Sequence, residues 1–296
     1  MLLLFFLLCC VLSGCELRST DSYIEQLGSG DSDERRKAAM ELLRRGPVVL
    51  PALIQELESK RSQVRYIVVQ VLGKLIEPEA VDALITSLDD RSPEVAGKAA
   101  ESLAHHGSPL ALAALLGYAD HTTTLRRSRA IRALGFCHSY EEEPELSDSA
   151  HRRIVSALND TASQVRIAAI EAAREFGFKG AAAPLMQLSR DPAPEVRHVA
   201  IQALGQILTG VAPNSEPVGP TTRDRIFAIL VDALGEPDFK SIRAKAMRAL
   251  GQIGDRRAIP HLQRMLGAGD DSDRREAGWA LEQLQRVGQA GSAIKG

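Results

Sequence analysis

The chain has 296 residues, of which 45% are hydrophobic, so a substantial core is expected and wholesale disorder is excluded. Aromatic residues are scarce (7 Phe, 4 Tyr and 1 Trp), which argues against an aromatic-rich β protein and against a base-stacking surface for single-stranded nucleic acid. The 36 basic residues nearly balance the 38 acidic ones, whereas nucleic-acid-binding proteins more often carry a basic excess. We therefore expect no nucleic-acid partner.

The chain opens with a continuous apolar run from Met1 to Leu12. As a helix this run would rise roughly 18 Å, well short of the ~30 Å hydrocarbon core of a bilayer. Its length is typical of the apolar part of a signal peptide. The alternative is a buried N-terminal helix of the folded domain.

The residues that end this run, Leu12-Ser13-Gly14-Cys15, resemble the lipobox of bacterial lipoproteins. The resemblance implies that residues 1–14 are a removable signal peptide, that Cys15 is the lipidation site, and that residues 15–22 form a tether. It departs from the family pattern in one respect, because no Lys or Arg precedes the apolar run. A cysteine with several acyl chains would hold the protein firmly at a membrane. The implied location is the bacterial cell envelope, on the periplasmic face of either membrane or the outer surface of the plasma membrane.

The cysteines agree with this scheme. Cys9 and Cys10 would leave with the signal peptide and Cys15 would carry lipid, so Cys137 would be the one thiol left for the folded part. A single thiol cannot form an internal disulfide. We expect Cys137 to be a small buried side chain rather than a nucleophile.

From residue 23 to residue 288 the chain repeats a unit of about 31 residues. Seven of eight aligned positions hold arginine and the third copy holds Ala96; the arginines are Arg36, Arg65, Arg127, Arg166, Arg197, Arg243 and Arg274. Apolar residues follow at helical spacing, ending seven positions later at Leu43, Leu72, Leu103, Leu134, Ala173, Leu204, Leu250 and Leu281. Each unit therefore begins with an amphipathic helix.

A second amphipathic helix follows each of the first seven, for example over 49–57 and 81–88. The first helix commonly ends near a glycine, for which we expect a left-handed cap: Gly46, Gly73, Gly135, Gly177, Gly205 and Gly251. The sequence thus predicts an all-α protein, an α-solenoid of about seven helix–turn–helix repeats plus a terminal half repeat, with a flexible tail at 289–296. We expect the second helices to line a concave groove that binds a partner.

The repeated pattern is Asp-x-x-x-Glu/Gln-Val-Arg-x-x-Ala-x-x-Ala-Leu-Gly, clearest from Asp160 and from Asp191. It resembles HEAT repeats, in particular the short type named from phycobilisome lyase subunits. Copies one, four and eight are looser and carry Arg35, Arg126 and Asp273 where valine is usual. The resemblance implies a non-enzymatic scaffold that binds one or more proteins. The alternative, suggested by the family name alone, is a chromophore-lyase-like or other assembly enzyme or chaperone.

The repeated arginine has two interpretations. It could form an anion-binding stripe, or it could form a structural ladder in which each guanidinium pairs with an aspartate or with loop carbonyls and ties neighbouring repeats together. We favour the ladder because arginine suits partly buried bidentate contacts better than lysine does. Such a ladder also accounts for the arginine excess, since eight of the 36 basic residues are lysine.

Two insertions lengthen the repeat after a first helix: an acidic one at 138–149 and one rich in Pro and Gly at 209–222. Both are expected at the same edge of the solenoid, where they could mark a binding face or be tolerated surface variation.

Catalytic chemistry is not evident in the sequence. The seven histidines show no metal-ligand spacing, and neither a phosphate-binding glycine loop nor a nucleophile elbow is present. We therefore predict no catalytic residue, metal, cofactor or small-molecule substrate.

Overall fold

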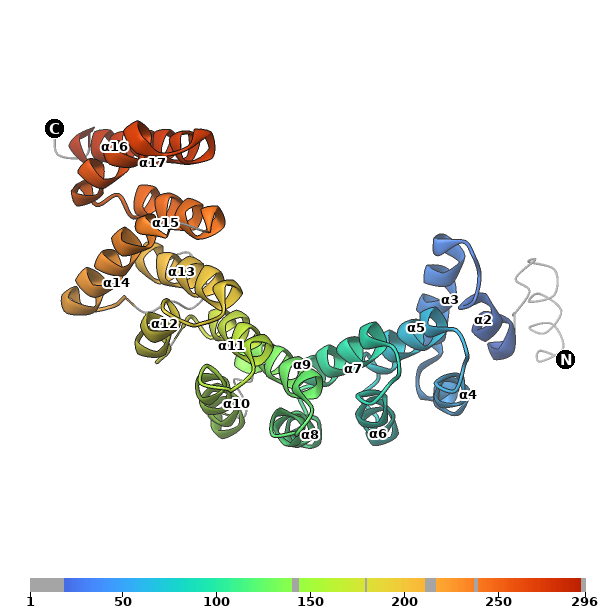
Figure 1. Ribbon diagram of the computed structural model, residues 1–296. Helices are drawn as coiled ribbons and strands as arrows, with labels where there is room; N and C mark the ends of the chain where they lie inside the picture. The colour runs from blue at the N-terminus through green and yellow to red at the C-terminus, as the bar shows by residue number, and fades with distance from the viewer. Residues whose placement is uncertain (1–18, 140–143, 179, 211–216, 237–238, 294–296) are drawn as a thin grey trace, which may run out of the picture. The chain divides into compact units, whose positions relative to one another are not determined.

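The computed structural model describes residues 19–139, 144–178, 180–210, 217–236 and 239–293 (Figure 1). In these ranges every regular element is an α- or 3-10 helix and no strand occurs, which confirms the prediction of an all-α solenoid. The predicted signal peptide and Cys15 lie outside the described residues, as do 140–143 and 211–216 of the two insertions.

The helices alternate between first and second helices of successive repeats. The first helices are α3 (Ser32–Arg45), α5 (Ser62–Leu72), α7 (Pro93–His106), α9 (Thr124–Leu134), α11 (Ser163–Glu175), α13 (Pro194–Thr209), α15 (Lys240–Ile253) and α17 (Asp271–Ala293). The second helices are α4 (Leu50–Glu56), α6 (Pro78–Ser87), α8 (Pro109–Ala119), α10 (Pro144–Ala157), α12 (Ala182–Leu188), α14 (Pro220–Asp232) and α16 (Ile259–Ala268). Short 3-10 turns are η1 (Gly46–Val49), η2 (Gly135–Ser139), η3 (Ala233–Gly235) and η4 (Arg256–Ala258).

Both ends of the helical region extend beyond the predicted bounds. Helix α2 (Thr20–Gln26) begins inside the predicted tether, with the Ser19 hydroxyl as its N-cap accepting from the Ser22 amide. At the other end α17 continues to Ala293, past the predicted boundary at residue 288.

The chain divides into two compact units, and the boundary in the sequence falls between Ala111 and Leu112, inside α8. In the first unit α3 packs on α5 and α5 packs on α7, while in the second α9, α11, α13, α15 and α17 form a row of neighbours. Aliphatic and alanine side chains make the core; in α13 Val196, Ala200 and Leu204 are fully buried on one face.

The glycines after the repeated leucine have a different role from the predicted one. Gly73 and Gly135 have right-handed φ angles of -65° and -56°, and Gly205 and Gly251 lie inside their helices. Of the six predicted left-handed caps, a positive φ occurs at Gly46 and Gly177 alone. The left-handed C-caps of α7, α13 and α15 are other glycines, Gly107, Gly210 and Gly254.

The glycines that follow the repeated leucine allow consecutive first helices to approach closely. A Cβ placed on Gly205 would lie 2.6 Å from the Cβ of Ala249 in the next first helix. A Cβ on Gly251 would lie 2.7 Å from the Cα of Ala280. The same relation recurs between Gly135 and Ala172, at 2.9 Å. Glycine at this position therefore serves helix–helix contact, not chain reversal.

Close approach of the first helices decides which side of the second unit is concave. Neighbouring first helices pack more extensively on each other than neighbouring second helices do. In the second unit α9, α11, α13 and α15 lie along the inner side of the curve, and α10, α12 and α14 along its outer side (Figure 1). For the second unit, the expectation that second helices line the concave groove was therefore wrong.

Candidate functional site

Two of the repeated arginines show most clearly how consecutive repeats are joined. Arg65 donates from Nε and Nη2 to both carboxylate oxygens of Asp90, at 2.7 and 2.8 Å, and from Nη1 to the Ser59 carbonyl at 2.7 Å. Arg166 makes the same bidentate contact with Asp191, at 2.8 and 2.7 Å. The carbonyl belongs to the loop before the arginine's own helix and the carboxylate to the corresponding loop one repeat later. One guanidinium thus bridges two repeats.

Three further arginines make related contacts between consecutive repeats. Arg127 pairs with Asp160 at 3.0 and 3.1 Å, and Arg243 pairs with Asp273 at 2.9 to 3.1 Å. Arg197 keeps the loop carbonyl contact, at 2.9 Å, and has Glu236 at 3.5 Å. All three side chains are at most 14% exposed. With Arg65 and Arg166, these contacts support the structural ladder over an anion-binding stripe.

In the first copy the repeated position belongs to Arg35, one residue before the predicted Arg36. Arg36 is therefore not a ladder residue. Arg35 donates to the carbonyl of Ser29, six residues earlier, at 2.7 Å. Arg65 likewise donates to the carbonyl of Ser59, six residues before it. Leu42 is fully buried, whereas Leu43 is half-buried. Arg36 lies on the exposed face of α3, where it pairs with Asp33 one turn earlier.

The last predicted ladder residue, Arg274, makes local contacts only. It donates to the Gly269 carbonyl at 2.6 Å and to Asp271 in its own helix. Its side chain is 48% exposed. No later repeat follows α17 in the described part of the chain, so a guanidinium here has no onward carboxylate to bind.

Two of the ladder carboxylates, Asp90 and Asp160, have lowered pKa values that favour their ionised form. Burial alone would raise the pKa of Asp90, but hydrogen bonds from Arg65 and from the Ser92 amide outweigh it, and the pKa falls below its ordinary 3.8. Asp160 has the same balance, with burial opposed by the hydrogen bonds of Arg127, and its pKa is also lowered. Deprotonation of these carboxylates is therefore coupled to folding.

We expect this coupling to appear as acid lability. Because the folded pKa of Asp90 is depressed, its contribution to stability is complete above the unfolded pKa of about 3.8 and is lost as pH falls through the folded value. Urea unfolding followed by circular dichroism at pH 7, 5, 4 and 3 should show this loss below pH 4. Asp90→Asn should be less stable at pH 7 and less sensitive to acid, while Asp82→Asn, on an exposed face of α6, should behave like the parent. Parallel acid profiles for the parent and Asp90→Asn would contradict the coupling.

The other residues singled out in the sequence are placed as follows. Cys137 lies in η2 and is fully buried, as predicted. The described parts of both insertions follow a first helix, and each leads into a long second helix, α10 from Pro144 and α14 from Pro220. Among the described residues, no three His, Cys, Asp or Glu side chains are grouped so that they could hold a metal ion. None of the described helices has the length and apolar character needed to span a membrane.

Several hollows open between neighbouring helices. One of about 470 Å³ lies between α3 and α5, and two smaller ones of about 180 and 240 Å³ lie between α11 and α13 and between α13 and α15. All three are on the first-helix side. A fourth, of about 550 Å³, lies between the second helices α12 and α14 and includes Arg190 and Arg225. Sequence patterns did not indicate these hollows, because they depend on how far apart two packed helices stand.

Comparison with known proteins identifies the family to which the repeats belong. The sequence matches the family of HEAT repeats over residues 50–135, 152–216 and 219–282. Its structure is similar to that of YibA from Escherichia coli, with 21% identity over 93% of this chain and 96% of the other and a TM-score of 0.53. It is also similar to Kap95p, with 14% identity over 93% of this chain and 40% of the Kap95p chain and a TM-score of 0.60. No curated protein matches it in sequence. Because the family matches cover well over half of the 296 residues, the chain belongs to the family of HEAT-repeat proteins.

Proposed function

We propose that this protein is a lipid-anchored, non-enzymatic scaffold of the bacterial cell envelope that binds partner proteins on its HEAT-repeat surface. The observation that carries the binding part of this proposal is the presence of hollows between consecutive first helices in each unit. In the second unit, arginine contacts also join neighbouring repeats. A surface of adjoining helices, tied repeat to repeat, presents many side chains in fixed positions to an elongated partner.

The family supports a binding role, since HEAT-repeat folds typically serve as scaffolds for protein interaction. Kap95p, which shares the fold, binds RanGDP. The proposal is tested by crosslinking in the native host followed by mass spectrometry. We expect recovery of a defined partner protein with crosslinks to the first helices. A covalently transferred chromophore after mixing the purified protein with a bilin would instead contradict the non-enzymatic assignment.

Membrane anchoring rests on the lipobox resemblance at Cys15. Replacing Cys15 by serine should move the protein from the membrane fraction to the soluble fraction, because serine lacks the thiol that accepts lipid. Fractionation with immunoblotting measures this change, and mass spectrometry of the N-terminal peptide should find acyl chains in the parent alone. Cys10→Ser, inside the apolar run, is the matched control and should remain membrane-bound. Equal membrane association of Cys15→Ser and the parent would remove the lipid anchor from the proposal.

A further inference from the structure

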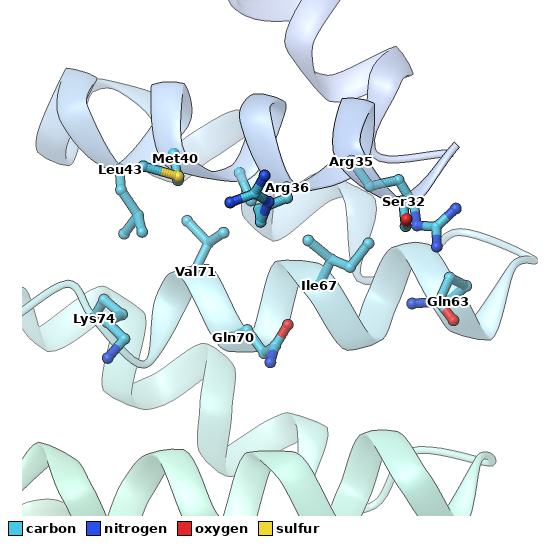
Figure 2. Close-up of a pocket in the computed structure, with 11 residues that line it drawn as sticks. Ser32, Arg35, Arg36, Met40, Leu43, Gln63, Ile67, Gln70, Val71 and Lys74 are labelled. Carbon is cyan, nitrogen blue, oxygen red and sulfur yellow. The ribbon is translucent and has the colours of Figure 1, made fainter. Parts of the chain in front are cut away.

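The junction of α3 and α5 lacks the close glycine contact found at several other junctions of first helices. Gly73, the C-cap directly after α5, comes eight residues after Arg65, and a Cβ placed on it would lie 2.6 Å from the Cβ of Ser102 in α7. The equivalent position after Arg35 is Leu43, whose side chain points into the gap between the two helices (Figure 2). A hollow of about 470 Å³ lies between α3 and α5 beside Leu43, and its volume is typical of a ligand-binding pocket.

The floor of this groove is apolar. Ala39 and Leu43 of α3 face Ile67 and Val71 of α5 across it, and the two α5 side chains are at most 7% exposed. Met40 stands at the edge with 61% of its surface exposed. A flexible apolar side chain exposed beside an apolar floor is suited to adapt to an inserted apolar group.

The rim of the groove is cationic. The charged residues that line the hollow are Arg35, Arg36 and Lys74. Gln63 and Gln70 also line it, and no carboxylate does. The ion pair of Arg36 with Asp33 is exposed on both sides, at 67% and 68%, so it is weak and readily exchanged. Lys74 is exposed and makes no ion pair with the described residues. The positive charge of this rim is complementary to an acidic partner.

We propose that this groove binds an acidic amphipathic helix of a partner protein. From Ser32 to Leu43 the groove wall runs roughly 16 Å, about three helical turns. An occupant of that length would insert apolar side chains at positions i, i+4 and i+7 over the floor and place Asp or Glu beside Lys74 and Arg36. This inference rests on the proposed scaffold function and adds the partner's chemistry: apolar on one face, acidic on its flanks.

A peptide selection tests the partner chemistry without knowing the partner. Phage displaying random 15-residue peptides is panned on the full-length protein, reconstituted in nanodiscs of zwitterionic lipid. We expect enrichment of peptides with Leu, Ile, Phe or Met at helical spacing flanked by Asp or Glu. Fluorescence anisotropy with the most enriched peptide should show at least tenfold weaker binding to Met40→Glu and to Lys74→Glu. Raised salt should also weaken binding.

Matched controls separate the groove from the rest of the surface. Val48→Glu places the same charge on another exposed apolar residue of the first unit, and Lys60→Glu reverses a lysine outside the groove. Both should bind the peptide within twofold of the parent. Enriched peptides that are basic, or that bind Met40→Glu and Lys74→Glu as well as the parent, would overturn the groove proposal while leaving a scaffold elsewhere intact. Binding of phosphatidylglycerol vesicles, but of no peptide, that depends on Met40 and Lys74 would make the groove a membrane-contact surface instead.

Discussion

Replacing Arg243 by methionine is expected to destabilise the C-terminal repeats by about 3–5 kcal/mol, the usual cost of removing one partner of a buried ion pair. The guanidinium donates to both oxygens of Asp273 and to the Glu236 carbonyl at 2.6 Å. The side chains of Arg243 and Asp273 are 9% and 5% exposed. Methionine would fill the space but leave the Asp273 carboxylate buried without its partner.

The double variant Arg243→Met, Asp273→Val should recover most of this loss, because no buried charge remains and valine is the usual residue at this repeat position. Urea unfolding followed by the fluorescence of Trp279 is a direct measurement. Trp279 is the one tryptophan in the chain, and it lies in α17, the helix that carries Asp273.

A matched control removes an exposed ion pair from the same helix interface. Arg248 and Glu276 join α15 and α17 at 2.6 Å, with side chains 53% and 20% exposed. Arg248→Met should cost under about 1 kcal/mol. If Arg243→Met and Arg248→Met unfold at the same urea concentration, or if the double variant is no better than Arg243→Met, the arginine contacts do not hold the repeats together as described.

Replacing Gly205 by alanine should destabilise the second unit by about 1–3 kcal/mol, although alanine ordinarily favours a helix over glycine. The new Cβ would lie 2.6 Å from the Cβ of Ala249, and neither atom belongs to a flexible chain end. Relief would require α13 and α15 to separate. Thermal or urea unfolding measures the loss.

The glycine at 205 and the alanine at 249 can also be exchanged between the two helices. Once Ala249 becomes glycine, the nearest atom remaining in contact is its Cα at 3.6 Å, an ordinary van der Waals distance. Gly205→Ala with Ala249→Gly should therefore be more stable than Gly205→Ala alone. Gly267→Ala, where an added Cβ meets nothing within 4 Å, is the control and should not destabilise. A stabilising Gly205→Ala would show that the close approach is not required.

The repeat architecture could be predicted from the sequence because it depends on local patterns. Apolar spacing identified the paired helices, and the repeated arginine indicated a ladder joining neighbouring repeats, of which the contact of Arg166 with Asp191 is an example. The register of the first copy could not be settled in this way. Arg35 and Arg36 are adjacent, as are Leu42 and Leu43, so a shift of one residue leaves the pattern almost unchanged. The structure separates them by burial.

The glycines and the groove show a second limit of prediction from the sequence. A glycine after a helical pattern is compatible with a left-handed cap or with close contact, and sequence spacing does not distinguish them. Gly205 makes contact because α15 lies against it, which is a tertiary fact. The same holds for the concave side and for the hollow beside Leu43, since both follow from the distances between helices.

The central claim, that partners bind the row of first helices, is most directly tested by a photo-crosslinking scan at exposed glutamines. A benzophenone amino acid is placed at Gln70 in α5 or Gln252 in α15, and at Gln55 in α4 or Gln263 in α16 as matched second-helix positions. After irradiation in the native host, adducts identified by mass spectrometry should come from Gln70 and Gln252. Adducts from Gln55 and Gln263 alone would contradict the account and place the partner on the second helices.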